Sequence, residues 1–308
     1  MKIGFIGLGT MGASMALNLR KAGYALVVSD LRREAAAPHL AAGCVWAESA
    51  GAVALASDVV FTSLPGPREI EAVALAESGL LANMRRGTAW FDLSTNSPTL
   101  IRRLHGQFAE KGIAVLDAPV SGGPTGAQSR KLALWVGGAR DEFDRHKAAL
   151  DAIGDQVIYI GPIGAGSIAK LVHNCAGYAI QTALAEVFTL GVKAGVEPLA
   201  LWSAVRQGAF GRARTFDRLA DQFLPGVYEP PSFALRLAHK DVTLATELAR
   251  ELNVPMRIAA LTHSEMTEAL NRGWGHLDSR SPMRLQQERA GVAIAVPPAE
   301  IEAALSIG

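Results

Sequence analysis

The chain begins with a short apolar run, Lys2–Ile6, that leads directly into three closely spaced glycines, Gly7, Gly9 and Gly12. A Gly-x-Gly-x-x-Gly pattern between a strand and a helix is typical of a turn that binds the pyrophosphate of a dinucleotide. The first glycine permits the tight turn, the second lets the backbone approach the pyrophosphate, and the third lets helix and strand pack closely. The pattern therefore predicts a set of cofactor-binding residues: Gly7, Leu8, Gly9, Thr10, Met11 and Gly12.

Short apolar runs recur between stretches with helical spacing through the first half of the chain. Strands that alternate with helices imply a parallel sheet covered on both faces. We therefore expect an α/β fold that begins with a Rossmann-type, doubly wound parallel sheet. The expected strands are Lys2–Ile6, Ala25–Asp30, Asp58–Leu64, Thr88–Leu93, Ile113–Val120, Leu132–Val136 and Val157–Ile160.

The alternation of strands and helices stops after Gly161. From Ser167 to Ala194 the chain keeps an apolar stripe at helical spacing without proline, which predicts one long interdomain helix. Further helical stretches follow, separated by proline and glycine breaks. We expect a dinucleotide-binding domain over 1–162 and a second, all-helical domain for substrate and oligomer contacts over 163–308, which ends in a short helical appendage of no assigned purpose.

The charge balance argues against a polyanionic partner. The 308 residues carry 30 basic and 29 acidic side chains, without a Lys/Arg run dense enough to follow nucleic acid or an anionic membrane. Only Cys44 and Cys175 are present, far apart, so a disulfide framework is not expected and a reducing compartment, the cytoplasm, fits. The apolar N-terminus is needed as a strand, so we expect neither signal cleavage nor membrane insertion.

Asp30 ends the second expected strand, where an acid can accept a hydrogen bond from the 2′-hydroxyl of a ribose and repel a 2′-phosphate. This position favours NAD. Arg32 and Arg33 follow at once, and a guanidinium can hold the phosphate of NADP, so NADP stays open.

Two loops follow strands and are expected to line the same ligand site, since ligands bind beyond the carboxyl ends of strands in such sheets. They are Ser63–Pro67, with Leu64 and Pro65, and Asp92–Pro98, in which Ser94, Thr95 and Asn96 can donate to ligand oxygens. The alternative is ordinary helix capping before a proline. The position after a strand favours cofactor binding by Leu64, Pro65 and Thr95.

Lys170 and Asn174 lie one helical turn apart in the segment GPIGAGSIAKLVHN, which starts at Gly161. Combined with the N-terminal glycine turn, this indicates a nicotinamide dehydrogenase with a lysine acid/base. Further ordered motifs are DLSTNSP from Asp92, DAPVSGG from Asp117 and, more weakly, HKDVTLA with Lys240. On these motifs the chain resembles the β-hydroxyacid dehydrogenase family from Gly4 to about Gly291. This family includes 3-hydroxyisobutyrate dehydrogenases, tartronate semialdehyde reductases, and the glyoxylate and succinic semialdehyde reductases.

The resemblance implies an NAD(P)-dependent oxidoreductase that acts on the CH–OH group of a short β-hydroxyacid or on its semialdehyde, with a helical domain of the 6-phosphogluconate dehydrogenase type. It implies that Lys170 is the catalytic acid/base and that Lys240 approaches both cofactor and substrate. The implied substrate-binding residues are Ser121, Gly122, Gly123, Asn174 and Lys240. The residue chemistry agrees, because two successive glycines free backbone N–H groups to converge on a carboxylate, and Lys170 and Asn174 share one helix face.

The sequence departs from the family pattern at Arg130-Lys131, where many relatives have a small pair, and we favour a surface explanation. Arg206, Arg212 and Arg214 could bind a second acidic group on the substrate, although such a run is more often a solvated helix start. His173 is adjacent to Asn174 but is more often packed or solvated in such a position. No His/Cys cluster has the spacing of a metal site, so no metal is expected.

Other functions remain open from the sequence. They are a semialdehyde or glyoxylate reductase that prefers NADPH, an imine reductase and a non-catalytic dinucleotide-binding module. Lys170 speaks against the last two. An apolar helical second domain leads us to expect a homodimer or homotetramer, with a small carboxylate as the substrate.

Overall fold

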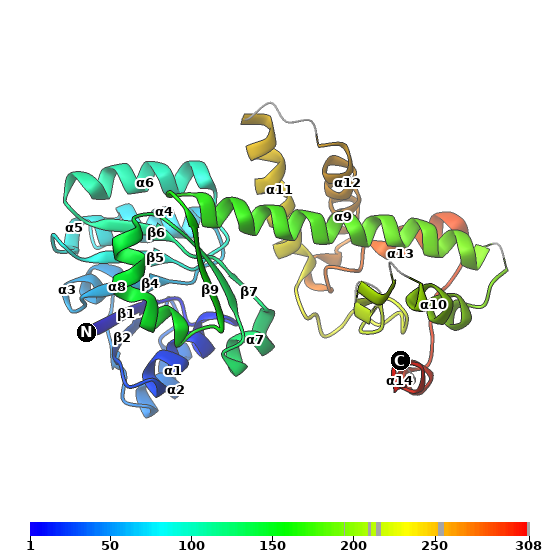
Figure 1. Ribbon diagram of the computed structural model, residues 1–308, viewed down its shortest axis with the longest axis horizontal. Helices are drawn as coiled ribbons and strands as arrows, with labels where there is room; N and C mark the ends of the chain where they lie inside the picture. Colours follow the sequence, from blue (N-terminus) through cyan, green and yellow to red (C-terminus); the bar gives the residue numbers. More distant parts are fainter. Residues whose placement is uncertain (194, 209–210, 214–216, 252–255, 307–308) are drawn as a thin grey trace. The chain divides into compact units, whose positions relative to one another are not determined.

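The computed structural model describes residues 1–193, 195–208, 211–213, 217–251 and 256–306. The chain divides into two compact units, Met1–Val172 and His173–Gly308. The helix α9 (Ala165–Lys193) begins in the first unit and continues into the second (Figure 1). This long helix matches the one predicted from the apolar stripe. The division into a dinucleotide-binding domain over 1–162 and a helical domain over 163–308 stays a prediction.

The described residues of the first unit form one nine-stranded sheet with the order β3-β2-β1-β4-β5-β6-β8-β7, and β9 pairs with β8. The strands from β3 to β6 run parallel, whereas β8 runs antiparallel to β6 and β7. The strand order reverses at β1 and β4, which is where a doubly wound sheet binds its ligand. The strands are β1 (Lys2–Ile6), β2 (Ala25–Ser29), β3 (Val45–Trp46), β4 (Val59–Thr62), β5 (Ala89–Asp92), β6 (Ala114–Asp117), β7 (Val120–Ser121), β8 (Ala133–Gly137) and β9 (Gln156–Gly161).

Two details of the predicted sheet were wrong. The expected strand Ile113–Val120 is interrupted after Asp117, so that β6 and the short β7 are separate strands. The sheet is also not parallel throughout, because β8 returns against β6 and β7. The strand β3 was not predicted, because its two residues lie below the length of an ordinary strand, although they stand in the short apolar stretch Cys44–Ala47.

Helices cover both faces of the sheet and close a separate apolar core on each (Figure 1). Neighbouring residues of β5 show the alternation, because Phe91 stacks on Phe61 at 5.3 Å in one core while Trp90 packs against Phe108 at 5.1 Å in the other. The helical segments are α1 (Gly12–Lys21), η1 (Arg33–Ala36), α2 (Ala37–Ala41), α3 (Ala50–Leu55), α4 (Pro67–Leu75), α5 (Leu80–Asn83), α6 (Pro98–Glu110), α7 (Gly123–Ser129) and α8 (Arg140–Asp151).

The second unit is helical in the part of the chain that the structure describes. Its helices close two apolar cores, one centred on Trp202 and Phe223 and the other on Leu235 and Met266. Ile301 of the C-terminal helix packs into the first of these cores. After α9 come α10 (Pro198–Gln207), η2 (Gly211–Ala213), η3 (Asp217–Leu219), α11 (Leu235–Glu251), α12 (Arg257–Asn271), η4 (Trp274–His276), α13 (Met283–Ala290) and α14 (Pro298–Ser306).

Both cysteines, Cys44 and Cys175, are buried and carry free thiols. Burial raises the pKa of each thiol, which makes both poor nucleophiles. Among the described residues, no helix combines the length and the apolar character needed to cross a bilayer.

Candidate cofactor and substrate site

The N-terminal glycine turn has the geometry that close approach of a ligand requires. Gly7 has a φ of 95°, and a Cβ there would lie 2.2 Å from the carbonyl oxygen of Ser63. A Cβ on Gly12 would lie 1.9 Å from the carbonyl oxygen of Gly7, so the first turn of α1 packs directly on the loop. A Cβ on Gly9, in contrast, would meet no atom within 4 Å. The space over Gly9 and the start of α1 fit a pyrophosphate group.

Asp30 lies directly after β2 and shapes the same turn. Its Oδ2 accepts the backbone N–H of Leu8 at 2.7 Å, and its Oδ1 accepts the N–H of Arg32 at 2.9 Å. Each carboxylate oxygen can accept a further hydrogen bond, which leaves capacity for a ribose hydroxyl. Arg33 forms an exposed ion pair with Glu48 at 2.8 Å and lies over the ring of Trp46.

The loops after β4 and β5 are joined through the fully buried carboxyl of Asp92. Asp92 accepts hydrogen bonds from Thr62 Oγ1 at 3.0 Å, from the backbone N–H of Ser94 at 3.0 Å and from Asn96 Nδ2 at 2.8 Å. Burial raises the pKa of Asp92 to about 6, although these donors oppose the shift. The carboxyl therefore fixes the backbone of both loops at the switch point of the sheet.

The polar side chains of the DLSTNSP loop have different roles in this hydrogen-bond network. Ser94 and Asn96 are buried, and Ser94 Oγ accepts the N–H of Leu64 at 2.9 Å, so these two side chains hold the loop together. Ser97 caps α6 by accepting the N–H of Leu100. Thr95 is only half-buried and remains the residue of this loop predicted to contact the cofactor. The capping interpretation thus holds for Ser97 but not for the whole loop.

The DAPVSGG segment ends in two consecutive glycines with positive φ, 136° at Gly122 and 63° at Gly123. Both glycines are exposed and follow Ser121, the last residue of β7. Successive backbone N–H groups in such a turn can converge on an anion. The geometry is compatible with the predicted carboxylate-binding role of Ser121, Gly122 and Gly123.

Asp117, the first residue of the same motif, was not singled out by the sequence analysis. It is buried at the end of β6 and accepts the backbone N–H groups of Gly164 at 2.7 Å and Ser167 at 2.5 Å. These amides belong to the turn that starts α9, so the carboxylate caps that helix. Lys170 lies one turn further along α9 and is half-buried.

In the helical unit, a buried aspartate brings together two of the predicted substrate-binding residues. Asn174 Nδ2 donates to Asp241 Oδ2 at 2.6 Å, and Lys240 Nζ lies 2.9 Å from Asp241 Oδ1. Asp241 lies inside α11, which begins at Leu235. Lys240 and Asp241 are adjacent in the HKDVTLA motif, but no local pattern in the sequence indicates Asn174 as their partner.

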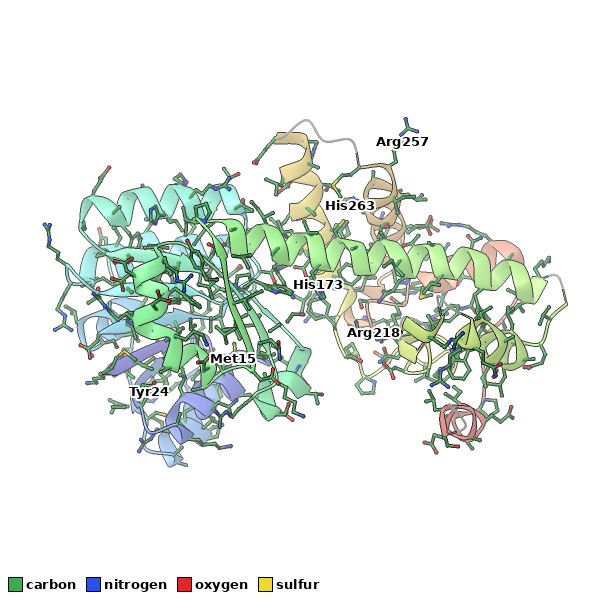
Figure 2. All side chains as sticks on the ribbon, viewed as in Figure 1. Met15, Tyr24, His173, Arg218, Arg257 and His263 are labelled. Atoms are coloured by element: carbon green, nitrogen blue, oxygen red, sulfur yellow. The ribbon has the colours of Figure 1, made fainter. Side chains whose placement is uncertain are left out.

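Other polar candidates lie apart from these contacts or outside the described residues. His173 is exposed on α9 (Figure 2). Arg206 lies over the ring of Trp202 at 5.3 Å, Arg212 is exposed, and Arg214 lies outside the described residues. Within the described residues, no group of three or more His, Cys, Asp or Glu side chains is arranged to hold a metal ion.

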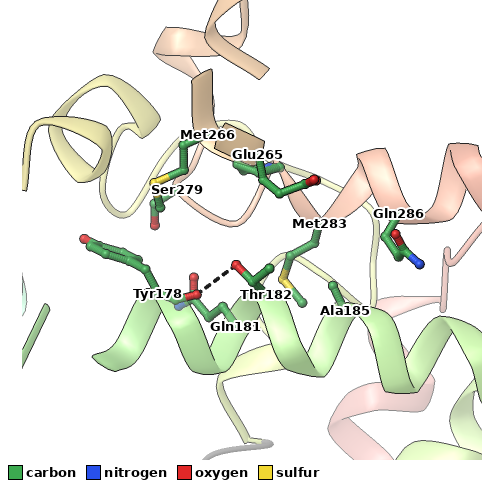
Figure 3. Close-up of a pocket in the computed structure, with 10 residues that line it drawn as sticks. Tyr178, Gln181, Thr182, Ala185, Glu265, Met266, Ser279, Met283 and Gln286 are labelled. Atoms are coloured by element: carbon green, nitrogen blue, oxygen red, sulfur yellow. Dashed lines mark hydrogen bonds between the residues drawn. The ribbon is translucent and has the colours of Figure 1, made fainter. Parts of the chain in front are cut away.

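A small cavity in the helical unit does not have the size of a substrate site. Figure 3 shows it between α9 and the segments that carry Met266, Ser279 and Met283, beside a hydrogen bond from Thr182 Oγ1 to the carbonyl of Tyr178. Its volume of about 30 Å³ has room for a water molecule and not for a hydroxyacid.

Comparison with known proteins identifies the family. Residues 2–161 match the model of the NAD-binding domain of 6-phosphogluconate dehydrogenase. Residues 164–286 match the NAD-binding domain of NADP-dependent 3-hydroxyisobutyrate dehydrogenase. The chain belongs to the β-hydroxyacid dehydrogenase family. This β-hydroxyacid dehydrogenase is therefore an NAD(P)-dependent oxidoreductase that transfers hydride to or from the hydroxyl-bearing carbon of a hydroxyacid, and the predictions of family, fold class and enzyme class are confirmed.

Its relatives span nearly the whole chain. 2-(Hydroxymethyl)glutarate dehydrogenase from Eubacterium barkeri is 34% identical over 294 residues, which cover 96% of this chain and 97% of the relative. NAD-dependent L-serine dehydrogenase from Pseudomonas aeruginosa is 36% identical over 285 residues, covering 90% and 95%. The crystal structure of 3-hydroxyisobutyrate dehydrogenase from Salmonella typhimurium matches with a TM-score of 0.80 at 28% identity and covers 92% of this β-hydroxyacid dehydrogenase and 99% of that chain.

Proposed function

We propose that this enzyme oxidises the terminal hydroxyl of a short β-hydroxyacid, or reduces the corresponding semialdehyde, with Lys170 as the general acid/base. The observation that carries the proposal is the placement of Lys170 and Asn174 one turn apart in the continuous helix α9, with Asn174 held by Asp241. A lysine and an amide on one helix face can serve a proton transfer and a polar contact to the same substrate.

The substrate class follows from what the relatives' names have in common. L-Serine, 3-hydroxyisobutyrate and 2-(hydroxymethyl)glutarate all contain the unit HO–CH2–CH(R)–COO⁻ and differ only in R. We infer that the substrate of this enzyme contains the same unit. The exposed backbone N–H groups of Gly122 and Gly123 and the hydroxyl of Ser121 would bind the carboxylate.

We assign the proton transfers of the reaction to Lys170. In the oxidation, Lys170 in its neutral form takes the proton of the substrate hydroxyl, and in the reduction its ammonium form returns a proton to the carbonyl oxygen. NAD(P), when held at the glycine turn Gly7–Gly12, would supply the hydride-transfer chemistry. Asn174, with one amide N–H committed to Asp241, would orient the substrate through its remaining amide atoms, and Lys240 would add a positive charge beside substrate and cofactor.

Asp30 supports NAD as the preferred cofactor, because its carboxylate accepts a ribose hydroxyl and repels a 2′-phosphate. Arg33, one of the two arginines that could bind that phosphate, forms an exposed ion pair with Glu48 in this structure. Asp30→Ala is expected to lower kcat/KM with NAD about 10- to 100-fold and to leave kcat/KM with NADP less affected. A wild-type kcat/KM for NADP equal to or above that for NAD would overturn this assignment.

The group R of the substrate sets the finer specificity. The 34% identity to 2-(hydroxymethyl)glutarate dehydrogenase, whose named substrate has a second carboxylate, favours the predicted role of the arginine run, in which Arg212 is exposed. An Arg212→Ala variant with unchanged KM for every dicarboxylic substrate would remove this role.

The assembly and location expected from the sequence stay proposals. Exposed apolar side chains on α9 and α12, among them Ile180 (41%), Ile258 (55%) and Leu261 (44%), support a homodimer or homotetramer. The two buried free thiols support a reducing compartment such as the cytoplasm.

The assay that tests the proposed function follows the absorbance of reduced nicotinamide. Wild-type protein with NAD or NADP is given L-serine, 3-hydroxyisobutyrate and 2-(hydroxymethyl)glutarate, with 4-hydroxybutyrate as the isomer that lacks the shared unit. We expect turnover with at least one of the first three acids. Turnover of 4-hydroxybutyrate without turnover of any of these three acids would contradict the proposed substrate unit.

A further inference from the structure

The carboxylate of Asp117 connects the sheet to the start of α9. It is the last residue of β6 and is 1% exposed. Its Oδ1 accepts the N–H of Gly164 at 2.7 Å and its Oδ2 accepts the N–H of Ser167 at 2.5 Å. Both oxygens are therefore used to hold the turn that begins α9. Charge-assisted hydrogen bonds of this kind are about twice as strong as neutral ones.

The packing around these hydrogen bonds leaves the start of α9 little freedom. A Cβ on Gly137 would lie 2.6 Å from Asp117 Oδ1, and a Cβ on Gly166 would lie 2.2 Å from the carbonyl oxygen of Trp135. Neither position can carry a side chain without moving backbone or carboxylate. The start of α9 thus packs directly against β6 and β8, and the side chain of Asp117 at the end of β6 lies at this contact.

Two groups of the proposed site depend on this one residue. The side chain of Asp117 fixes Ser167, and Lys170 follows Ser167 by three residues, which is about one helical turn. The backbone of Asp117 leads within four residues to Ser121, where the glycine turn begins. A rotation of the first turn of α9 would displace the ammonium of Lys170 relative to Ser121–Gly123.

We propose that Asp117 is a positioning residue, which sets the orientation of Lys170 relative to the carboxylate-binding turn by anchoring the start of α9. This inference rests on the proposed function, since it assigns a catalytic consequence to the anchor. Displacement of a reacting group by about 1 Å can cost about 100-fold in rate. The inference therefore predicts a large effect on kcat from a residue that touches neither substrate nor cofactor.

The test uses Asp117→Asn, in which the added NH2 group cannot accept a backbone N–H. We expect kcat to fall about 30- to 100-fold, while the Kd for the cofactor stays within about twofold of wild type. In a Lys170→Ala background the same exchange is expected to lower kcat less than about threefold, because its effect acts through Lys170. Equal fold losses in the two backgrounds, or an unchanged kcat in Asp117→Asn, would overturn the inference.

Glu197→Gln is the matched control, because Glu197 caps α10 by accepting the N–H groups of Leu199 at 3.1 Å and Ala200 at 2.8 Å. It removes a carboxylate cap from a helix that carries neither Lys170 nor a residue of the carboxylate-binding turn Ser121–Gly123. We expect its kcat to stay within about twofold of wild type. If kcat fell as much in Glu197→Gln as in Asp117→Asn, general destabilisation would explain both losses, and the inference would be contradicted.

Amide hydrogen exchange separates failure of the anchor from failure of the proposed function. In the wild-type protein, the amides of Gly164 and Ser167 are expected to exchange as slowly as those of β6, and in Asp117→Asn at least about tenfold faster. Fast exchange of these amides in the wild type would contradict the anchor even if Asp117→Asn did not fold. Slow exchange in a wild-type protein that turns over no hydroxyacid would contradict the proposed function and, with it, the catalytic meaning of the anchor.

Discussion

Asn174 Nδ2 donates a hydrogen bond to Asp241 Oδ2 at 2.6 Å, although 67 residues separate the two in sequence. The carboxylate is 1% exposed and also lies 2.9 Å from Lys240 Nζ. A buried carboxylate needs such partners to offset its desolvation. Asp241 therefore accepts a hydrogen bond from the amide of Asn174 with one oxygen and forms an ion pair with the ammonium of Lys240 through the other.

Asp241→Asn is expected to lower kcat/KM for the hydroxyacid by about 10- to 100-fold, because the exchange removes the negative charge beside Lys240 and leaves one acceptor oxygen where two carboxylate oxygens face Asn174 and Lys240. Steady-state kinetics against wild type measures this effect. Glu247→Gln, an exposed change on the same helix, serves as the control and is expected to leave kcat/KM within about twofold. Equal kinetics in wild type and Asp241→Asn would show that the contact has no part in the reaction.

Asp92 gives the stability of the sheet unit a pH dependence of known sign. Its folded-state pKa of about 6 lies above the ordinary value of 3.8, so the folded protein binds this proton more tightly than the unfolded chain. The resulting stability is fully present below about pH 4 and is lost as the pH rises through 6, a change of about 3 kcal/mol.

The contribution of Asp92 is isolated by comparing wild type with Asp92→Asn. Denaturant unfolding from pH 4 to 8 is expected to show wild type losing stability relative to the variant as the pH rises. His146 and His239 act in the opposite direction, because burial lowers the pKa of each, but they are common to both proteins. A constant difference in unfolding free energy across this range would rule out the raised pKa of Asp92.

Arg130→Gly is expected to stabilise the protein by about 0.5 to 1 kcal/mol. Arg130 ends α7 in the left-handed conformation with a φ of 61°, which disfavours residues that have a Cβ. The departure from the small pair of the family thus has a backbone cost. Arg145→Gly, within α8, is the matched exchange and is expected to cost about 1 kcal/mol. Thermal unfolding of both variants measures the contrast, and equal destabilisation by the two would contradict it.

The parts of the structure that sequence predicted well are those with local signals. The glycines of the first turn and the apolar stripe of α9 each lie within one continuous segment, so their spacing was enough to predict the elements. The reversal of β8 depends on its pairing with β6 and β7, and no local pattern encodes the direction of a neighbouring strand.

The roles of the aspartates that hold the candidate site could not be predicted from the sequence for the same reason. Asp117 accepts amides 47 and 50 residues away in sequence, and Asp241 accepts an amide 67 residues away. Asp92 contacts Thr62 on a neighbouring strand. Each of these carboxylates acts through a partner that only the fold brings close. The residues predicted to contact ligands lie in recognisable motifs. The partners of the aspartates that orient these residues cannot be identified from the sequence.

The acid/base role of Lys170 is tested by comparing kcat of Lys170→Ala with kcat of Lys193→Ala, which removes an exposed lysine from the same helix. Both variants are assayed on the best hydroxyacid with saturating cofactor, and cofactor Kd is measured in parallel. The account predicts that Lys170→Ala loses about 10²- to 10⁴-fold in kcat with cofactor Kd unchanged, while Lys193→Ala stays within about twofold of wild type. A Lys170→Ala protein that oxidises the acid at the wild-type rate would contradict it.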